Sequence, residues 1–397
     1  MKKTNIPWAP YVPDNWIIER GKRVLDLKKR PVRDNDEVIT CFRDGEVILR
    51  SLRRTEGFTM SDKEIGYQGI NEGDIVIHGM DGFAGAMGVS KSTGKGSPVL
   101  VVCTPKNNHN SRYLIFYLRT LAYNNVFLAL STGIRERSCD LKWNKISELD
   151  FLLPPIEEQK AIAEIIDRKC GEVDEMVSLQ EQVIEELKAY KQSVITEAVT
   201  KGLNPTAPMK PTNIDWIGQI PTHWGICQIN ALAMLQSGNS LKTEDITDNV
   251  ELYPVYGGNG IRGYYKDYLL DGRYVLIGRQ GALCGNIKVT REKFWVTEHA
   301  VICYPKHDFN TSWFAYMLES MNLNQYSLSA AQPGLAIDRI KRQILVLPPL
   351  SEQREIAVFL DRKCADIDAL IALKQQKIED LKQYKKSLIY EYVTGKK

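Results

Sequence analysis

The chain has 397 residues, 43% of them hydrophobic and 25% charged, with a formal net charge of +3. This length is enough for two or three domains of ordinary size, and the composition is that of a soluble globular protein. The small net charge does not by itself identify a nucleic-acid-binding protein, and no segment resembles a membrane span or a secretory signal.

The N-terminal region, residues 1–153, is predicted to be a mixed, β-rich domain. DIVIHG (74–79) and SPVLVVCTP (97–105) combine β-branched residues with bounding Gly and Pro, which is typical of strands. SRYLIFYLRTLAY (111–123) is predicted to be a helix because its apolar residues recur at helical spacing.

A long helix is predicted for residues 154–202. Pro154 and Pro155 suit a first helical turn, and the glutamates that follow are favoured there by the helix dipole. Gly202 provides a stop signal, and the proline-rich segment 203–211 is expected to be a linker.

The second half repeats this organisation. Residues 212–347 are predicted to form a second mixed domain, and residues 348–397 a second long helix. The predicted strands are YVLIG, NIKVT and HAVICYP, and the predicted helix is TSWFAYMLESMN (311–322), which follows its last strand as the first domain's helix does.

Three matched pairs of segments indicate a tandem duplication of the whole chain. The strongest match joins the starts of the two long helices, and the two others join the start of each half and one Gly-rich turn in each half. The pairs are 152–176 with 346–370, WAPYVPDNW (8–16) with WIGQIPTHW (216–224), and GDIVIHGMDGFAGAM (73–87) with GRYVLIGRQGALCGN (272–286).

Both long helices carry a mostly apolar stripe with alternating steps of three and four residues, which predicts a coiled-coil seam. Such a stripe needs a partner, and we expect the two copies to pair antiparallel within one molecule. Ordinary domain helices or a homodimeric coiled coil are the alternatives. Cys170 and Cys364 lie on this stripe and are interpreted as small packing residues. The expected fold class is therefore α+β, with two β-rich domains, each followed by one helix of an intramolecular coiled coil.

The motifs LPPIEEQKAIAEIID, LPPLSEQREIAVFLD and IPTHW, with VPDNW as a slightly divergent copy, resemble the specificity subunit of type I restriction–modification systems. The resemblance covers essentially the whole chain. It implies a non-catalytic, cytoplasmic subunit in which each domain recognises one half of a split double-stranded DNA site and the helices set the spacer. It also implies docking of methyltransferase (modification) subunits, two of them expected, and of motor-nuclease (restriction) subunits. No cofactor is expected in this chain, whereas S-adenosylmethionine, ATP and magnesium are expected in those partners.

Catalytic motifs find little support in the sequence. The eight cysteines include no CxxC pair and the five histidines show no metal-binding spacing, so we expect neither disulfides nor a zinc site. A glycine follows Lys95 where a nucleotide-binding loop needs Ser or Thr. Asp14, Asp26 and Lys28 loosely fit a nuclease pattern, which leaves a self-sufficient metal-dependent nuclease as one alternative. A coiled-coil scaffold that binds no DNA is the other.

The candidate DNA-contacting residues are basic, amide or aromatic side chains in Gly-rich or basic segments. The matched turns, with His78 in one half and Arg279–Gln280 in the other, are favoured because the duplication marks that place twice, although His78 could equally be a buried polar group. The candidates are Arg50, Arg53, Arg54, His78, Lys91, Lys95, Arg135 and Arg137 in the first domain, and Tyr256, Asn259, Arg262, Arg279, Gln280 and Gln332 in the second.

Overall fold

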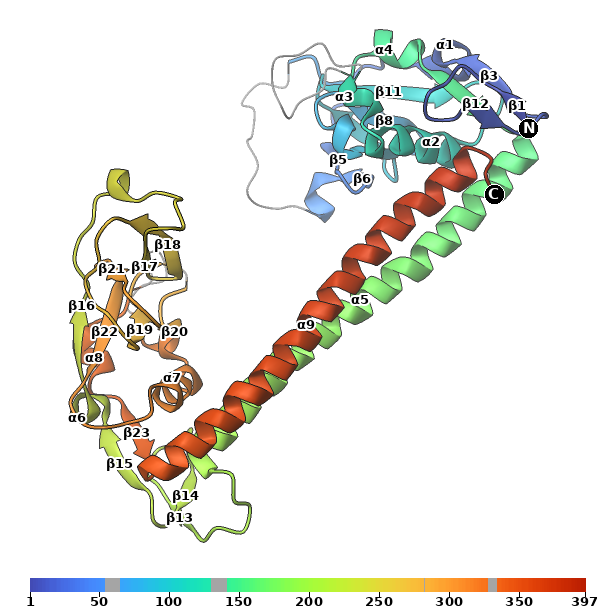
Figure 1. The fold of residues 1–397 in the computed structure, drawn as a ribbon. Coiled ribbons are helices and arrows are strands. Elements are labelled where there is room, and N and C mark those ends of the chain that lie inside the picture. The colour runs from blue at the N-terminus through green and yellow to red at the C-terminus, as the bar shows by residue number, and fades with distance from the viewer. Residues whose placement is uncertain (54–64, 130–140, 282, 328–333) are drawn as a thin grey trace. The chain divides into compact units, whose positions relative to one another are not determined.

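The computed structural model describes residues 1–53, 65–129, 141–281, 283–327 and 334–397. Contacts divide the chain into two compact units, residues 1–180 with 376–397, and residues 181–375. Each unit contains one globular domain and a section of both long helices (Figure 1). The predicted division into five consecutive segments is not tested by this grouping and stays a prediction.

The globular domain of the first unit is built on a four-stranded antiparallel sheet in the order β4-β11-β8-β9. Its strands are Leu25–Leu27 (β4), Leu100–Pro105 (β11), Ile75–His78 (β8) and Met87–Val89 (β9). Helix α2, Ser111–Tyr123, packs against β9, and the side chain of its N-cap Asn110 accepts hydrogen bonds from the first-turn backbone. The apolar strand residues are buried on both faces of the sheet: Ile75, Ile77 and Cys103 share a core with α2, and Val76, Leu100 and Val102 belong to a second core.

The globular domain of the second unit has the same frame. Its sheet follows the equivalent order β16-β22-β19-β20, with strands Ala233–Ser237, Ala300–Pro305, Val275–Gly278 and Ile287–Val289. Helix α7, Thr311–Ser320, follows β22 and is capped by Asn310. The predicted strands and helices of both halves are thereby confirmed.

The two domains differ in the strands added around this frame. The first has the hairpin β5–β6, Ile39–Cys41 with Val47–Leu49, and the pair β7–β10, Gln68–Ile70 with Gly94–Gly96. The second instead has a three-stranded sheet in the order β18-β17-β21, made by Gly260–Tyr265, Tyr253–Gly257 and Trp295–Val296. The duplicated core is thus kept while its additions have diverged.

Helix α5 spans Ile156–Lys201 and helix α9 spans Leu350–Val393. At a rise of 1.5 Å per residue, the 46 residues of α5 extend about 69 Å. Each helix is followed by a glycine in the left-handed conformation, Gly202 with φ 77° and Gly395 with φ 69°. This backbone conformation, which glycine adopts without strain, explains why α5 ends at the predicted stop and why α9 ends at Val393, shortly before Gly395.

Within each unit, the α5 and α9 sections run antiparallel. In the first, the start of α5 and the end of α9 both contact the N-terminal segment, through Glu158 with Trp16 and Tyr390 with Trp8. Every position of the predicted seam is buried or half-buried, which confirms the coiled-coil assignment.

Two interhelical ion pairs show the symmetry of this pairing. Lys385 contacts Asp174 at 2.6 Å in the first unit, and Lys191 contacts Asp368 at 2.7 Å in the second. The repeat aligns Asp174 with Asp368 and Lys191 with Lys385, so the two bridges are copies of one interaction.

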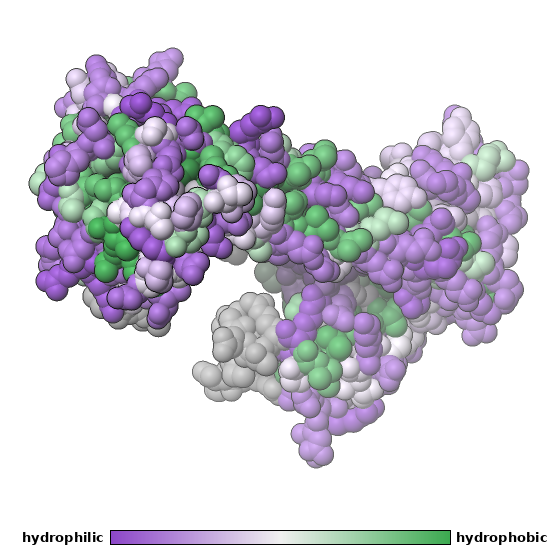
Figure 2. All heavy atoms as spheres, turned by 90° about the horizontal axis from the view of Figure 1, so that it is seen from below, coloured by the Kyte–Doolittle hydropathy of each residue, from purple (hydrophilic) through white to green (hydrophobic). Residues whose placement is uncertain are grey.

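On the face drawn in Figure 2, hydrophilic side chains predominate and hydrophobic ones lie between them in small groups. Across the described ranges, no helix is both long and apolar enough to cross a membrane.

Candidate nucleic-acid interface

The best-matched sequence motifs anchor each globular domain to the start of a long helix. The indole Nε1 of Trp16 donates to Glu158 at 2.8 Å, and that of Trp224 donates to Glu352 at 3.0 Å. Both tryptophans are almost fully buried. The Trp at the start of each half and the Glu after each proline pair therefore recur together because they form one contact.

The glutamine that follows each of these glutamates has an equally definite role. Gln159 donates to the carbonyl oxygen of Pro154 at 2.9 Å and accepts from the backbone N–H of Asn110 at 3.0 Å. Gln353 makes the same two contacts, with Pro348 and Asn310, both at 2.9 Å. Each buried amide thus joins the helix start to the N-cap of α2 or α7, a function that the helix-start interpretation of the motif missed.

The matched turns that follow β8 and β19 are equivalent. Their backbone hydrogen bonds show which residue of one turn corresponds to which residue of the other. Gly79 N–H donates to Val99 at 2.9 Å, and Arg279 N–H donates to His299 at 2.8 Å. Leu141 and Leu335 in turn donate to the carbonyls of Gly79 and Arg279. Arg279 therefore corresponds to Gly79, and Gln280 to the following residue, whereas His78 lies one position earlier, on the strand itself.

His78 is bound within its own turn. Its Nδ1 accepts a hydrogen bond from the backbone N–H of Asp81 at 3.0 Å, and Asp81 is also paired with Arg43 at 2.7 Å. Burial lowers the pKa of His78, which favours the neutral imidazole. The half-buried ring therefore takes part in the structure of its own turn, and its contact with DNA stays a prediction.

The other described candidates of the first domain surround the β5–β6 hairpin. Arg53 pairs with Asp44 and with Glu46, and Lys91 contacts Glu46 at 2.8 Å. Arg53 holds the pKa of Asp44 below its usual range through their hydrogen bond. These two cations are therefore partly neutralised by neighbouring carboxylates.

Two further candidates are bonded to residues in or next to β5. Arg50 Nε donates to Thr40 at 3.2 Å, and Lys95 lies on β10 with its N–H bonded to Glu37 at 2.8 Å. Three first-domain candidates and one second-domain candidate lie outside the described residues: Arg54, Arg135, Arg137 and Gln332.

In the second domain, the structure brings the tip of the β17–β18 hairpin against the turn after β19. A Cβ added to Gly278 would lie 2.0 Å from the carbonyl oxygen of Gly258, and one added to Gly258 would lie 2.6 Å from that of Gln280. Only glycine permits such a close approach of two backbones. As a result, Asn259 at the hairpin tip and Gln280 in the turn belong to one small surface.

Four side chains lock this surface, and we call them the amide clasp: Asn259, Gln280, Asn286 and His299. Asn286 Nδ2 donates to Asn259 Oδ1 at 2.8 Å, and His299 Nδ1 lies 2.5 Å from Gln280 Oε1. Asn286 and His299 were not among the sequence candidates, because their partners become neighbours only after folding.

The remaining second-domain candidates are two arginines and one tyrosine that packs against the core. Arg279 donates to Ser237 at 2.9 Å, and the exposed Arg262 lies with its aliphatic stem across Gly257. Tyr256 packs edge-on against Phe294 with ring centroids 5.8 Å apart, so its ring belongs to the core side of the sheet. Burial raises the pKa of its phenol.

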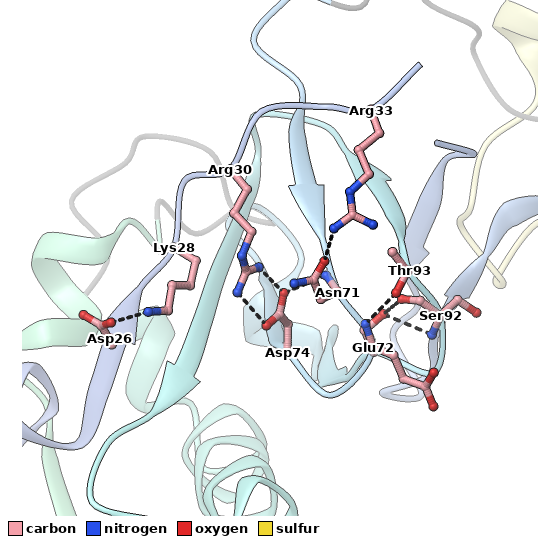
Figure 3. Close-up of polar contacts among 10 residues, drawn as sticks. Asp26, Lys28, Arg30, Arg33, Asn71, Glu72, Asp74, Ser92 and Thr93 are labelled. Carbon is pink, nitrogen blue, oxygen red and sulfur yellow. Dashed lines mark hydrogen bonds and ion pairs between the residues drawn. The ribbon is translucent and has the colours of Figure 1, made fainter. Parts of the chain in front are cut away.

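A polar cluster in the first domain fixes the segment after β4 (Figure 3). Arg30 forms a two-point ion pair with Asp74, which is almost fully buried, and Asp74 also accepts from the N–H of Asn71 at 2.8 Å. Arg33 donates to the Asn71 side chain at 3.1 Å. These contacts tie residues 30–33 to the start of β8 and account for charged residues that no sequence motif explained.

The residues of the nuclease-like pattern are engaged separately. Asp26 pairs with Lys28, and this hydrogen bond lowers the pKa of Asp26, whereas Asp14 accepts from the N-terminal ammonium at 2.9 Å. Within the described part of the chain, no cluster of three or more His, Cys, Asp or Glu side chains is arranged to hold a metal.

The two seam cysteines are buried in the cores of their units. Burial raises the pKa of Cys170 to about 11 and that of Cys364 above its ordinary value. Both thiols are therefore protonated near neutral pH, as packing residues would be.

Comparison with known proteins gives a consistent result. The family described as "Type I restriction modification DNA specificity domain" matches residues 53–189 and 221–383. The Escherichia coli protein named "Type I restriction enzyme EcoprrI specificity subunit" is 41% identical over 137 residues, 34% of this chain and 34% of that relative. The putative MjaX specificity subunit of Methanocaldococcus jannaschii is 23% identical over 425 residues, covering 100% of this chain and 96% of its own.

Solved structures share the fold. A chain from a type I restriction–modification structure, described for complex assembly and conformational transition, matches with a TM-score of 0.74 at 15% identity, covering 96% of this chain and 98% of that one. The HsdS subunit from Thermoanaerobacter tengcongensis matches with a TM-score of 0.53 at 16% identity, covering 97% and 98%.

Proposed function

The chain belongs to the family of type I restriction–modification DNA specificity proteins, and from this premise we propose how its halves divide the recognition of DNA. The first globular domain recognises one half of a split site on double-stranded DNA, and the second recognises the other half. The paired helices α5 and α9 set the spacer between the two half-sites.

The comparison of the two globular domains supports the proposal that each one recognises a different half-site. Both domains keep the same sheet order, the same Trp–Glu anchor and the same buried glutamine. They differ in the strands added to that frame and in the side chains of the equivalent turns. A common frame with divergent contact elements is what two modules need if they attach identically but recognise different base sequences.

We further propose that this chain contributes recognition and assembly, while its partners carry out the chemistry. Methyltransferase (modification) subunits, two of them, dock on the duplicated helical frame, and motor-nuclease (restriction) subunits join the complex. S-adenosylmethionine, ATP and magnesium act in those partners. The near-repetition of the helix surfaces supports two equivalent docking positions, because copied sequences present copied contacts.

Mapping methylated bases across the genome, in cells with and without this gene, tests the proposal. We expect a single split recognition sequence that is methylated only when the gene is present. Replacing residues 1–153 by the corresponding domain of a relative is expected to change one half-site and leave the other half and the spacer unchanged. A continuous short site, or a change in both halves, would contradict the two-domain proposal.

A further inference from the structure

In the amide clasp, the exposed side-chain amides of Asn259 and Gln280 are both bonded through their carbonyl oxygens. The carbonyl oxygen of Asn259 accepts from Asn286, and that of Gln280 is bonded to His299 Nδ1. Because an amide oxygen can only accept, Nδ1 of His299 is the donor in this contact. Both amides are therefore oriented with the oxygen toward the protein.

The opposite ends of these amides remain available. Asn259 and Gln280 are exposed, and neither NH₂ group donates to another described residue. Arg262, also exposed, adds a guanidinium on the neighbouring strand β18. The hairpin tip and the β19 turn together present hydrogen-bond donors, fixed in direction by their own domain.

Base pairs differ in what they offer to such a surface. In the major groove, guanine presents the acceptors N7 and O6, and the polar edge of thymine is the acceptor O4. Cytosine presents a donor, and adenine presents one donor beside one acceptor. A fixed NH₂ donor is therefore matched by N7 or O6 of guanine, O4 of thymine or N7 of adenine, and it is mismatched against the N4 amino group of cytosine, where two donors would face each other.

We propose that Asn259 and Gln280 are specificity-determining residues of the second domain, and that their NH₂ groups donate to acceptor atoms on base edges in one half-site. Asn286 and His299 are positioning residues that hold the two amides by their oxygens. This inference rests on the proposed function, since it requires that the second domain binds DNA.

The first domain lacks the hydrogen bond that orients Gln280 in the second domain. The hydrogen-bond register places Val99 at the level of His299, and Met80 at the level of Gln280. An apolar pair of this kind cannot form the same hydrogen bond. Changes in the amide clasp are therefore expected to alter one half-site only.

The experiment uses the full chain assembled with its modification subunit and a duplex DNA library that is randomised in sequence. Bound DNA is sequenced for the unaltered protein and for the Gln280→Glu and Asn259→Asp variants, which replace an NH₂ donor by an acceptor of the same shape. Asn249→Asp is the matched control, because it adds the same charge at an exposed position of this domain whose side-chain oxygen accepts from Glu251 N–H.

We expect the unaltered complex to select a split site with a defined base preference in each half. Gln280→Glu and Asn259→Asp should each reduce that preference about tenfold or more at one position of one half-site, which corresponds to the loss of one good base contact. The other half-site should be unchanged, and Asn249→Asp should select the original sequence.

The positioning role has its own readout. His299→Leu should relax the base preference at the Gln280 position while the complex keeps its melting temperature. His299→Asn, which places an N–H donor near the lost Nδ1, should restore the preference. A residue needed only for packing would not be rescued in this way.

The outcomes separate the inference from the function on which it rests. If the unaltered complex selects no split site, the proposed function fails. If it does select one and both donor-replacing variants select the same sequence, the inference is wrong and the function stands.

Discussion

Replacing Gln159 by alanine tests whether the buried glutamine is what joins the first globular domain to helix α5. The side chain is fully buried, with 0% exposure. It contacts the Pro154 carbonyl, the Asn110 N–H and His109 Nδ1 at 2.9–3.0 Å. The substitution removes all three contacts and leaves the part-buried N–H of Asn110 and the buried carbonyl of Pro154 without these protein partners.

The expected loss follows from those two backbone groups. Leaving a buried donor or acceptor unpaired costs about 1–3 kcal/mol, and water entering the space offsets part of it. We therefore expect the free energy of unfolding of the first unit to fall by about 2–4 kcal/mol. For a folding unit of 150–250 residues, a loss of about 3 kcal/mol lowers the melting temperature by about 6–12 °C.

Calorimetry of the full chain measures this change, and amide hydrogen exchange in α2 shows where it occurs. Gln182→Ala is the matched control, because the same side chain is removed at an exposed position of the same helix. Its effect should stay within about 0.5 kcal/mol. If Gln159→Ala were no more destabilising than Gln182→Ala, the assigned role of the buried amide would be refuted.

Three further predictions concern single positions. Gly171→Ala should stabilise the first unit by about 0.5–1 kcal/mol in urea unfolding, because Gly171 lies inside α5 and a Cβ there meets nothing within 4 Å. No change or a loss would contradict that. Gly278→Ala should lower the stability of the second unit by about 1–3 kcal/mol, because the added Cβ would overlap the Gly258 carbonyl. Gly225→Ala, with its nearest neighbour at 3.8 Å, serves as the control and should be nearly neutral. His78, whose pKa is lowered by burial, should make the first unit less stable as the pH falls below about 6.5, because the unfolded chain then binds a proton more readily than the folded one. His78→Asn, which keeps a hydrogen-bond acceptor but does not titrate, should show a flatter pH profile between pH 7 and 5, and an unchanged profile would exclude His78 as the cause.

Much of the architecture could be predicted from local patterns. The proline pairs and glycines marked both ends of the long helices, and the three- and four-residue spacing marked their seam. Strands such as Ile75–His78 and Val275–Gly278 were recognisable because buried strands are continuous apolar runs. The strands of the β17–β18 hairpin were missed, because their glycines and tyrosines have no simple alternation.

The candidate site was less accessible to sequence reasoning. Gln280 and Asn259 are recognisable as amides in Gly-rich turns, but nothing in the sequence indicates their partners. His299 and Asn286 are separated from them along the chain and lie on other segments. Arg53 and Lys91 are recognisable as cations, but their pairing with Asp44 and Glu46 depends on a hairpin that the sequence did not predict.

By itself, the sequence determined the duplication, the long helices, the seam and the strands of the common frame. These features follow from residue spacing and from the conformational preferences of proline and glycine, which act over a few neighbouring residues. Only the tertiary structure decided that Glu158 meets Trp16, that Arg279 rather than His78 corresponds to Gly79, and that Asn286 and His299 hold the two exposed amides. Such contacts join residues far apart in the chain, and their geometry exists only once the sheet register brings the segments together.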